Sequence, residues 1–454
     1  MTSLWEETAG PVRARAPLAG DATADVVVLG GGYSGLWTAL HLLDRDPALD
    51  VLVVEARHVG FGASGRNGGW FSSKVAGIAD LLADPATRDG GIALQRLMIE
   101  TVADGGRFLA REGIECDWVR SGTVDAATSP AQEALARAYL AVFAEAGFGD
   151  DFRWAPAEEM AERFRPAGLR GGYVTPHTAS VHPLKLVRGL AAAVERRGGR
   201  IVEGTTAELA GPGAVRTDRG TVRAPVVIHA TEAYSGSLPG RGREVAPVYS
   251  LMVATAPLPA EVWEVIGLPN RETFADWRRL IVYGQRTADD RIAFGGRGAP
   301  YHYGSAIDPA FDTDQAVAEA LVAALRGLFP DVADHLDATH HWGGPLGVPR
   351  DWRPSVRFDP TTGVGSLGGY VGQGVAASAL AGRSMAALVL GHDDDEAAHL
   401  PWVGHRSPRW EPEPLRWLGV NAGLALTKWT DDDERRTGRE ARLRGAVIHR
   451  LVGL

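Results

Sequence analysis

Short apolar runs separated by glycine clusters mark the first part of the chain. Residues 25–29 form a mainly apolar, β-branched run, as in a buried parallel strand, and three glycines follow directly. Apolar residues then repeat at helical spacing from Leu36 to Leu43, and this pattern ends near residue 46. A second apolar run covers residues 51–55. The pattern predicts a strand, a glycine turn, a helix and a second strand within about thirty residues.

The remaining pattern predicts further helices and strands, with residues 1–24 as an irregular arm. Helices are predicted at 92–112, 130–147, 183–197, 314–328 and 415–452. Strands are predicted at 117–124, 201–204, 226–230, 248–255, 279–283, 291–294 and 364–370, with a hairpin around 211–213. A helix is expected to follow the last strand and to reach about residue 390.

These elements predict an α/β (α+β) fold of two domains that are both discontinuous in sequence. A Rossmann-like dinucleotide-binding domain is expected from residues 20–85, 175–245 and 345–395. An antiparallel β-sheet domain is expected from residues 86–174 and 246–344. Residues 396–454 are expected to form a C-terminal helical extension.

Composition and charge exclude several classes of function. The formal net charge of −9 argues against a nucleic-acid partner. Cys116 is the only cysteine, so neither an intrachain disulfide nor a metal site of several thiolates can form. The histidines never occur at H-E-x-x-H spacing. We therefore expect no metal site. Residues 1–7 lack the features of a signal peptide, and no run reaches eighteen apolar residues, so we expect a cytoplasmic protein without a membrane partner.

The first glycine cluster has the spacing of a dinucleotide-binding fingerprint. Gly30 can make the tight turn, Gly32 can let the backbone approach a pyrophosphate, and Gly35 can let the helix pack on the strand. Glu55 ends the second strand twenty residues later, where a carboxylate can bind both ribose hydroxyls. The neighbouring candidate contacts are Tyr33, Ser34 and Ala56. The fingerprint leaves FAD and NAD open, while the acid disfavours NADP.

Two further glycine segments favour FAD. The first candidate contacts lie just after the second strand, at Gly62, Ala63, Ser64, Arg66, Asn67, Gly68 and Gly69. The second set lies late in the chain, at Gly343, Gly344, Gly369, Gly372, Gln373, Gly374 and Val375. The late segment places another helix N-terminus beside a cofactor, where its dipole stabilises the negative charge of a reduced flavin. An NAD enzyme does not need this late element.

Taken together, these motifs resemble those of the FAD-dependent amine and amino-acid oxidoreductases of the D-amino-acid-oxidase superfamily, which includes sarcosine and glycine oxidases. The segments at 24–32, 60–69, 182–186, 227–234, 342–347 and 369–374 carry the resemblance, which is strongest to the γ-glutamylputrescine-oxidase-like branch. The resemblance implies an antiparallel sheet over the flavin, hydride transfer from a carbon next to an amine nitrogen to flavin N5, and hydrolysis of the resulting imine. It also implies that O2 is usually reduced to H2O2.

The chain departs from this family at positions that bear on catalysis. Trp70 follows the second glycine segment where relatives often carry Gln, and it is a candidate stacking wall. The region that carries an oxygen-activating lysine in monomeric sarcosine oxidases corresponds here to residues 292–297, which end in Arg297 and contain no lysine. His341 is the third catalytic candidate. Cys116 lies far from the family's late flavin-linking cysteine, so we expect non-covalent FAD.

Several functions therefore stay open at this stage. The leading hypothesis is an amine or amino-acid oxidase that uses a small-molecule substrate and O2. A flavin dehydrogenase with another electron acceptor, an FAD-dependent monooxygenase and a non-catalytic flavin-binding protein are the alternatives.

Overall fold

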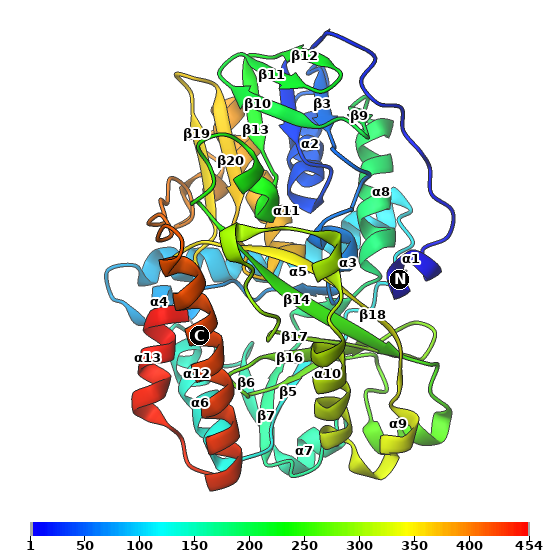
Figure 1. Cartoon of the computed structure of the whole chain (residues 1–454), viewed down its shortest axis with the longest axis vertical. Helices are drawn as coiled ribbons and strands as arrows, with labels where there is room; N and C mark the ends of the chain where they lie inside the picture. The colour runs from blue at the N-terminus through cyan, green and yellow to red at the C-terminus, as the bar shows by residue number, and fades with distance from the viewer. Residues whose placement is uncertain (1–2, 453–454) are drawn as a thin grey trace.

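The computed structural model describes residues 3–452, and two large sheets dominate it (Figure 1). The upper part of Figure 1 holds a six-stranded sheet and the lower part an eight-stranded sheet. The predicted α/β class with two kinds of sheet is confirmed. No helix among the described residues is long and apolar enough to cross a membrane.

The six-stranded sheet has the order of a doubly wound dinucleotide-binding fold. Its strands in spatial order are β19 (Ser355–Asp359), β20 (Val364–Gly368), β13 (Val226–His229), β2 (Val26–Leu29), β3 (Val51–Val54) and β9 (Arg200–Val202). The strands from β20 to β9 pair in parallel, and only β19 is antiparallel to its neighbour. Every residue of β2 and β3 is buried, which is why these strands are continuous apolar runs.

Three of the described helices pack on this sheet: α2 (Tyr33–Arg45), α8 (Pro183–Arg196) and α11 (Gly374–Leu390). Helix α5 (Arg88–Glu112) packs on α11. Helix α11 packs on α2, where a Cβ added at Gly382 would lie 2.8 Å from the Thr38 amide nitrogen. Glycine at this position therefore permits the close approach of the two helices that flank the predicted cofactor site.

Two smaller sheets complete this half. One contains β1 (Ala22–Thr23), β12 (Gly220–Arg223), β11 (Ala214–Thr217) and β10 (Ala207–Gly211), which include the predicted hairpin. The other pairs β4 (Trp70–Ser72) with β8 (Thr178–Ser180). The short helices α3 (Ala63–Arg66), α4 (Ile78–Ala83) and η1 (Glu232–Ser237) connect these segments.

The eight-stranded sheet is mostly antiparallel. Its strands in spatial order are β18 (Ala338–Val348), β14 (Ala246–Thr255), β17 (Ile292–Gly296), β16 (Val282–Arg286), β15 (Thr273–Asp276), β5 (Thr123–Ala127), β7 (Gly171–Thr175) and β6 (Arg153–Pro156). Helices α6 (Pro130–Glu145), α7 (Ala157–Ala161), α9 (Ala260–Ile266) and α10 (Gln315–Leu328) pack around it, and η2 (Tyr303–Ser305), η3 (Pro309–Asp312) and η4 (Pro330–His335) lie in its loops. Only β5 and β15 pair in parallel.

The structure departs from several local predictions. The strand expected at 117–124 begins only at Thr123, because Gly122 adopts φ +87° and Asp117 adopts φ +56°. Strand β15 was not predicted. The arm at 1–24 is not wholly irregular, since α1 (Leu4–Thr8) begins with a capping box between Ser3 and Glu6. The domain boundaries stay a prediction. Strand β18 (Ala338–Val348) continues across the boundary that we expected between residues 344 and 345.

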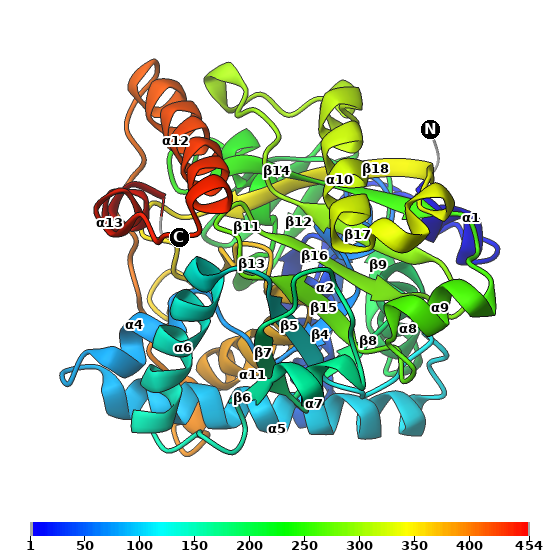
Figure 2. The same ribbon diagram turned by 90° about the horizontal axis from the view of Figure 1, so that it is seen from below.

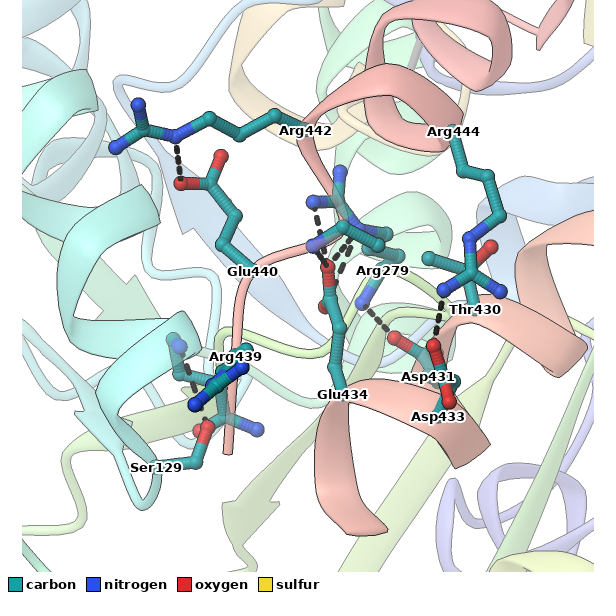
Figure 3. A network of polar contacts seen from close by, with 12 residues as sticks. Ser129, Arg279, Thr430, Asp431, Asp433, Glu434, Arg439, Glu440, Arg442 and Arg444 are labelled. Carbon is teal, nitrogen blue, oxygen red and sulfur yellow. Dashed lines mark hydrogen bonds and ion pairs between the residues drawn. The ribbon is translucent and has the colours of Figure 1, made fainter. Parts of the chain in front are cut away.

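The C-terminal extension ends in two helices, which an Arg279–Glu434 ion pair joins to a loop of the eight-stranded sheet (Figures 2 and 3). After η5 (Glu396–His399), α12 (Leu415–Thr437) ends at Gly438 and α13 (Arg442–Val452) follows, so the single helix expected over 415–452 is broken. Glu434 accepts hydrogen bonds from Arg279 Nη2 and the Ala441 amide, both at 2.8 Å. The extension therefore fixes the loop between β15 and β16.

Candidate active site

The first glycine turn is shaped by close backbone contacts. Gly30 has φ +110°, and a Cβ added there would lie 2.5 Å from the carbonyl oxygen of Ala230. A Cβ added at Gly35 would lie 2.0 Å from the carbonyl oxygen of Gly30. Gly32, the N-cap residue of α2, has no side chain that could cap the helix, and the positive end of the helix dipole lies at this turn. This arrangement suits an anionic group at the helix end.

Glu55 lies beside this turn at the end of β3. Its Oε2 accepts a hydrogen bond from the Gly31 amide and its Oε1 one from the Arg57 amide, both at 2.8 Å. Burial raises the pKa of Glu55, and these two amides oppose the increase because they stabilise the carboxylate. Ala56 is exposed next to it.

The second glycine segment is joined to the first by Ser64. Its hydroxyl oxygen accepts a hydrogen bond from the Tyr33 amide at 2.9 Å, and a Cβ added at Gly32 would lie 2.8 Å from it. Gly62 precedes α3, which contains Ala63, Ser64 and Arg66. The Asn67 side-chain amide donates to the Ala63 and Ser64 carbonyls and its oxygen accepts from the Gly69 amide. The two predicted loops therefore form one connected structure.

The Arg66 side chain binds to residues of the eight-stranded sheet and its loops. Its Nη1 donates to Asp312 Oδ2 at 2.6 Å and to the Gly343 carbonyl at 3.1 Å, and a Cβ added at Gly344 would lie 3.4 Å from its Cδ. Its guanidinium also lies over the Phe61 ring. Arg66 thus links the second glycine segment to β18 and η3.

Two indoles hold the end of α3 from outside. Trp342 Nε1 donates to the Arg66 carbonyl and Trp5 Nε1 donates to the Asn67 carbonyl, each at 2.9 Å. The two rings meet edge to face. The sequence did not identify Trp5, which lies in the arm and outside every glycine motif. The sequence signal that could have indicated a short, packed helix here is the capping box of Ser3 and Glu6, which encloses the apolar pair Leu4-Trp5.

The late glycine segment lies against the start of α2. Gly369 and Gly372 have φ +79° and +86°, and the intervening Val371 has φ +55°. Ser34 Oγ donates to the Tyr370 hydroxyl at 3.1 Å, which joins α2 to this segment. Helix α11 begins at Gly374 after Gln373, which provides no side-chain cap and whose Oε1 is buried without a partner among the described residues. Val375 is buried.

One face of the eight-stranded sheet lies towards these loops, and we call it the inner face. Continuous strand pairing places Trp342, Met252, Gly295 and Tyr283 in one row on it. A Cβ added at Gly68 would lie 2.4 Å from Tyr283 Cε2, and one at Gly69 would lie 2.1 Å from Gln285 Nε2. Glycine at 68 and 69 is therefore required for the second segment to lie on the inner face. Sequence reasoning missed Tyr283.

Trp70 lies over the same part of the inner face. Its Nε1 donates to the Gly284 carbonyl at 3.2 Å, and its ring meets Tyr283 edge to face. Trp70 is partly exposed, as a wall of the predicted site would be. Beside it, Lys74 Nζ pairs with Asp125 Oδ2 at 2.6 Å and lies over the Tyr173 ring.

Arg297 follows β17 on the inner face. By continuing the pairing of Leu251 with Gly296, it lies opposite Ser250 and on the same side as Gly295. Its Nη2 donates to the Val371 carbonyl at 3.0 Å, while Nη1 is buried with no partner among the described residues. Burial lowers the pKa of Arg297 to about 10, so the guanidinium is a cation at neutral pH. A buried cation with a free donor is suited to an anionic ligand.

His341 is not brought to this site. It pairs with Val253, whose side chain packs with those of Leu321 and Leu325 of α10 on the opposite, outer face. Trp342, the next residue, lies on the inner face because side chains alternate along a strand. Tyr249 also lies on the outer face, with His302 and Phe311. The proposed site therefore does not include His341.

The residues present fit FAD. The N-cap residues of α2 and α11 provide no side-chain cap, Glu55 stands at the end of the second parallel strand, and Gln373 has a buried oxygen without a partner among the described residues. These are the donors and acceptors that a pyrophosphate, a ribose and a flavin ring require.

Comparison with known proteins gives the same result. The DAO family of FAD dependent oxidoreductases matches residues 25–388. The chain is 30% identical to the probable oxidoreductase OrdL of Rhizobium meliloti (strain 1021) over 398 residues, which cover 85% of this chain and 88% of that protein. It is also 30% identical to the gamma-glutamylputrescine oxidoreductase of Escherichia coli (strain K12) over 402 residues, or 85% and 89% of the two chains.

Solved structures agree on the fold. Glycine oxidase from Geobacillus kaustophilus superposes with a TM-score of 0.67 at 22% identity, covering 82% of this chain and 95% of that one. L-proline dehydrogenase from P. horikoshii gives 0.66 at 18% identity, with 84% and 96% covered. The family and the fold class predicted from the motifs are thereby confirmed: this chain belongs to the DAO family of FAD dependent oxidoreductases.

Proposed function

We propose that this protein uses non-covalently bound FAD to oxidise a C–N bond in a small amine or amino acid. The names of its relatives support this substrate class, since they include a gamma-glutamylputrescine oxidoreductase, a glycine oxidase and an L-proline dehydrogenase. When bound, FAD supplies a hydride acceptor at N5. The substrate that has lost the hydride is an imine, which water then hydrolyses.

The observation that carries the proposal is the unpartnered Nη1 of Arg297 on the inner face. Nη2 is already held by the Val371 carbonyl of the late glycine segment, so the guanidinium has a fixed orientation. A substrate carboxylate bound at Nη1 would be positioned beside the predicted cofactor loops. This favours an amine that also carries a carboxylate.

Tyr283 and Trp70 would form the walls around the reacting carbon. The Tyr283 hydroxyl lies 3.2 Å from Ser250 Oγ, and burial raises the pKa of Tyr283. Tyr283 therefore stays protonated at neutral pH and can orient an amine without removing its proton. The two aromatic rings would exclude water from the site.

The cofactor contacts are proposed from the three glycine segments. They are Gly30, Gly32, Tyr33, Ser34, Gly35, Glu55 and Ala56, then Gly62 to Ser64 and Arg66 to Gly69, then Gly343, Gly344, Gly369 and Gly372 to Val375. Cys116 is buried and burial raises its pKa to about 12, which disfavours the thiolate needed for a covalent link.

The electron acceptor has two candidates. Ala293 occupies the inner face in the row of Gln285, and the segment 292–297 offers Arg297 but no lysine. Two functions are therefore proposed for the reoxidation step. One is an oxidase that reduces O2 to H2O2, and the other is a dehydrogenase that uses another electron acceptor. An FAD-dependent monooxygenase would instead require reduction by NAD(P)H.

The test is anaerobic titration of the FAD-loaded protein with a panel of amines and amino acids, followed by visible flavin absorbance. Bleaching by a carboxylate-bearing amine is expected, and admission of air with peroxide detection then separates oxidase from dehydrogenase. Bleaching by NAD(P)H and by none of the amines would overturn the proposal.

A further inference from the structure

Glu232 lies where the first turn and the late glycine segment meet. It begins η1 after β13, and it adopts φ +46°, a left-handed conformation that is uncommon for a residue with a side chain. Two residues earlier, the Ala230 carbonyl lies against the turn at Gly30. Strain of this kind persists where surrounding contacts fix the residue.

The two carboxyl oxygens of Glu232 have different surroundings. Oε1 accepts a hydrogen bond from the Tyr370 amide at 3.2 Å. Oε2 is buried and has no hydrogen-bond partner among the described residues. A Cβ added at Gly347 would lie 2.0 Å from Oε2, so glycine in β18 leaves the room that this oxygen occupies. A buried, unpartnered oxygen beside the cofactor loops points to a ligand contact.

The electrostatics favour a neutral carboxyl. Burial raises the pKa of Glu232 to about 7, against the opposing effect of the Gly369 and Tyr370 amides. Among the described side chains, no charged group contributes to this shift, and the Tyr370 phenol is a titratable group that interacts with Glu232. Glu55 differs, because backbone amides bind both of its oxygens.

We propose that Glu232 is a proton-linked contact for FAD: the cofactor binds the form of the protein in which this carboxyl is neutral. An ionised Glu232 would repel the pyrophosphate anion that the neighbouring helix N-terminus attracts. Binding at a pH above the pKa of the free protein therefore takes up one proton onto the Glu232 carboxylate. The proposal rests on the FAD dependence in the proposed function and is independent of the amine substrate.

The test measures the Kd of FAD for the apoprotein from pH 6 to pH 8.5, without any amine. If FAD binds only when Glu232 is protonated, and the pKa of Glu232 in the free protein is about 7, the Kd of FAD should rise about 30-fold from pH 6 to pH 8.5. Glu232→Gln should keep the affinity of the wild type at pH 6 within a few-fold and lose the rise. Glu55→Gln, a matched change in the carboxylate beside the first glycine turn, should keep the rise while binding FAD more weakly throughout.

A second readout needs no variant. Calorimetry of FAD binding to the wild type at pH 8, in two buffers of different ionisation enthalpy, should show uptake of close to one proton. No proton uptake, or the same pH dependence in wild type and Glu232→Gln, would overturn the proposal. Failure of amines to bleach the flavin would contradict the proposed substrate class and leave this result unaffected.

Discussion

The two large sheets build their parts of the site in different ways. At the edge of the six-stranded sheet, glycines at close backbone contacts and the starts of α2 and α11 form the proposed cofactor loops. On the inner face of the eight-stranded sheet, side chains such as Arg297 and Tyr283 project from paired strands. Changes in the first region should therefore alter retention of FAD, and changes in the second should alter reaction with substrate.

The largest effect is expected for Gly35→Ala. The new Cβ would lie 2.0 Å from the Gly30 carbonyl oxygen, so the turn must move, at a cost of about 3 kcal/mol or more in stability. The purified protein should contain little FAD and unfold at a lower temperature. Gly327→Ala is the control, because it is also a helical glycine but has open space around it. It should raise the stability by about 0.5–1 kcal/mol.

Arg297→Gln should have the second largest effect and a different signature. Loss of a charge-assisted hydrogen bond of about 1.5–3 kcal/mol should slow flavin reduction by a carboxylate-bearing amine roughly 10- to 150-fold. FAD content should be unchanged. Arg350→Gln, which changes an arginine whose side chain is paired with Glu411, should react like the wild type. Equal loss in both variants would contradict the assignment.

Tyr283→Phe should give a smaller loss of reduction rate. The change keeps the ring against Gly68 and Trp70 and removes the hydroxyl that lies near Ser250. One hydrogen bond of about 1 kcal/mol corresponds to roughly a fivefold decrease in rapid-mixing measurements. A complete loss of reduction would instead indicate that the hydroxyl transfers a proton.

Trp5→Phe should have the smallest effect, on the cofactor side. It removes the N–H that donates to the Asn67 carbonyl, worth about 1 kcal/mol, so the Kd of FAD should rise a few-fold. Trp417→Phe, a change at a partly exposed tryptophan of α12, is the matched control and should leave the Kd unchanged. An unchanged Kd in Trp5→Phe would show that the arm does not stabilise the second glycine segment.

The same contrast explains what could be predicted from sequence. Backbone sites leave a signature at fixed spacing, so the spacing of residues alone predicts Gly30, Gly35 and Glu55 as cofactor contacts. The inner face depends on strand pairing over long distances, and a shift of one residue exchanges the two faces. His341 and Trp342 are adjacent in sequence, yet pairing with Val253 and Met252 places only Trp342 towards the loops. The positions of Tyr283 and Trp5 are likewise set by tertiary contacts and could not be predicted from sequence. The same holds for the unpartnered Oε2 of Glu232.

The most direct test of this division compares wild type and Arg297→Gln, both as purified, for bound FAD and for anaerobic bleaching by a carboxylate-bearing amine. The account predicts equal flavin content and normal chemical reduction in both proteins, with reduction by the amine slowed at least about tenfold in the variant. Undiminished reduction by the amine, or loss of FAD from the variant, would contradict it.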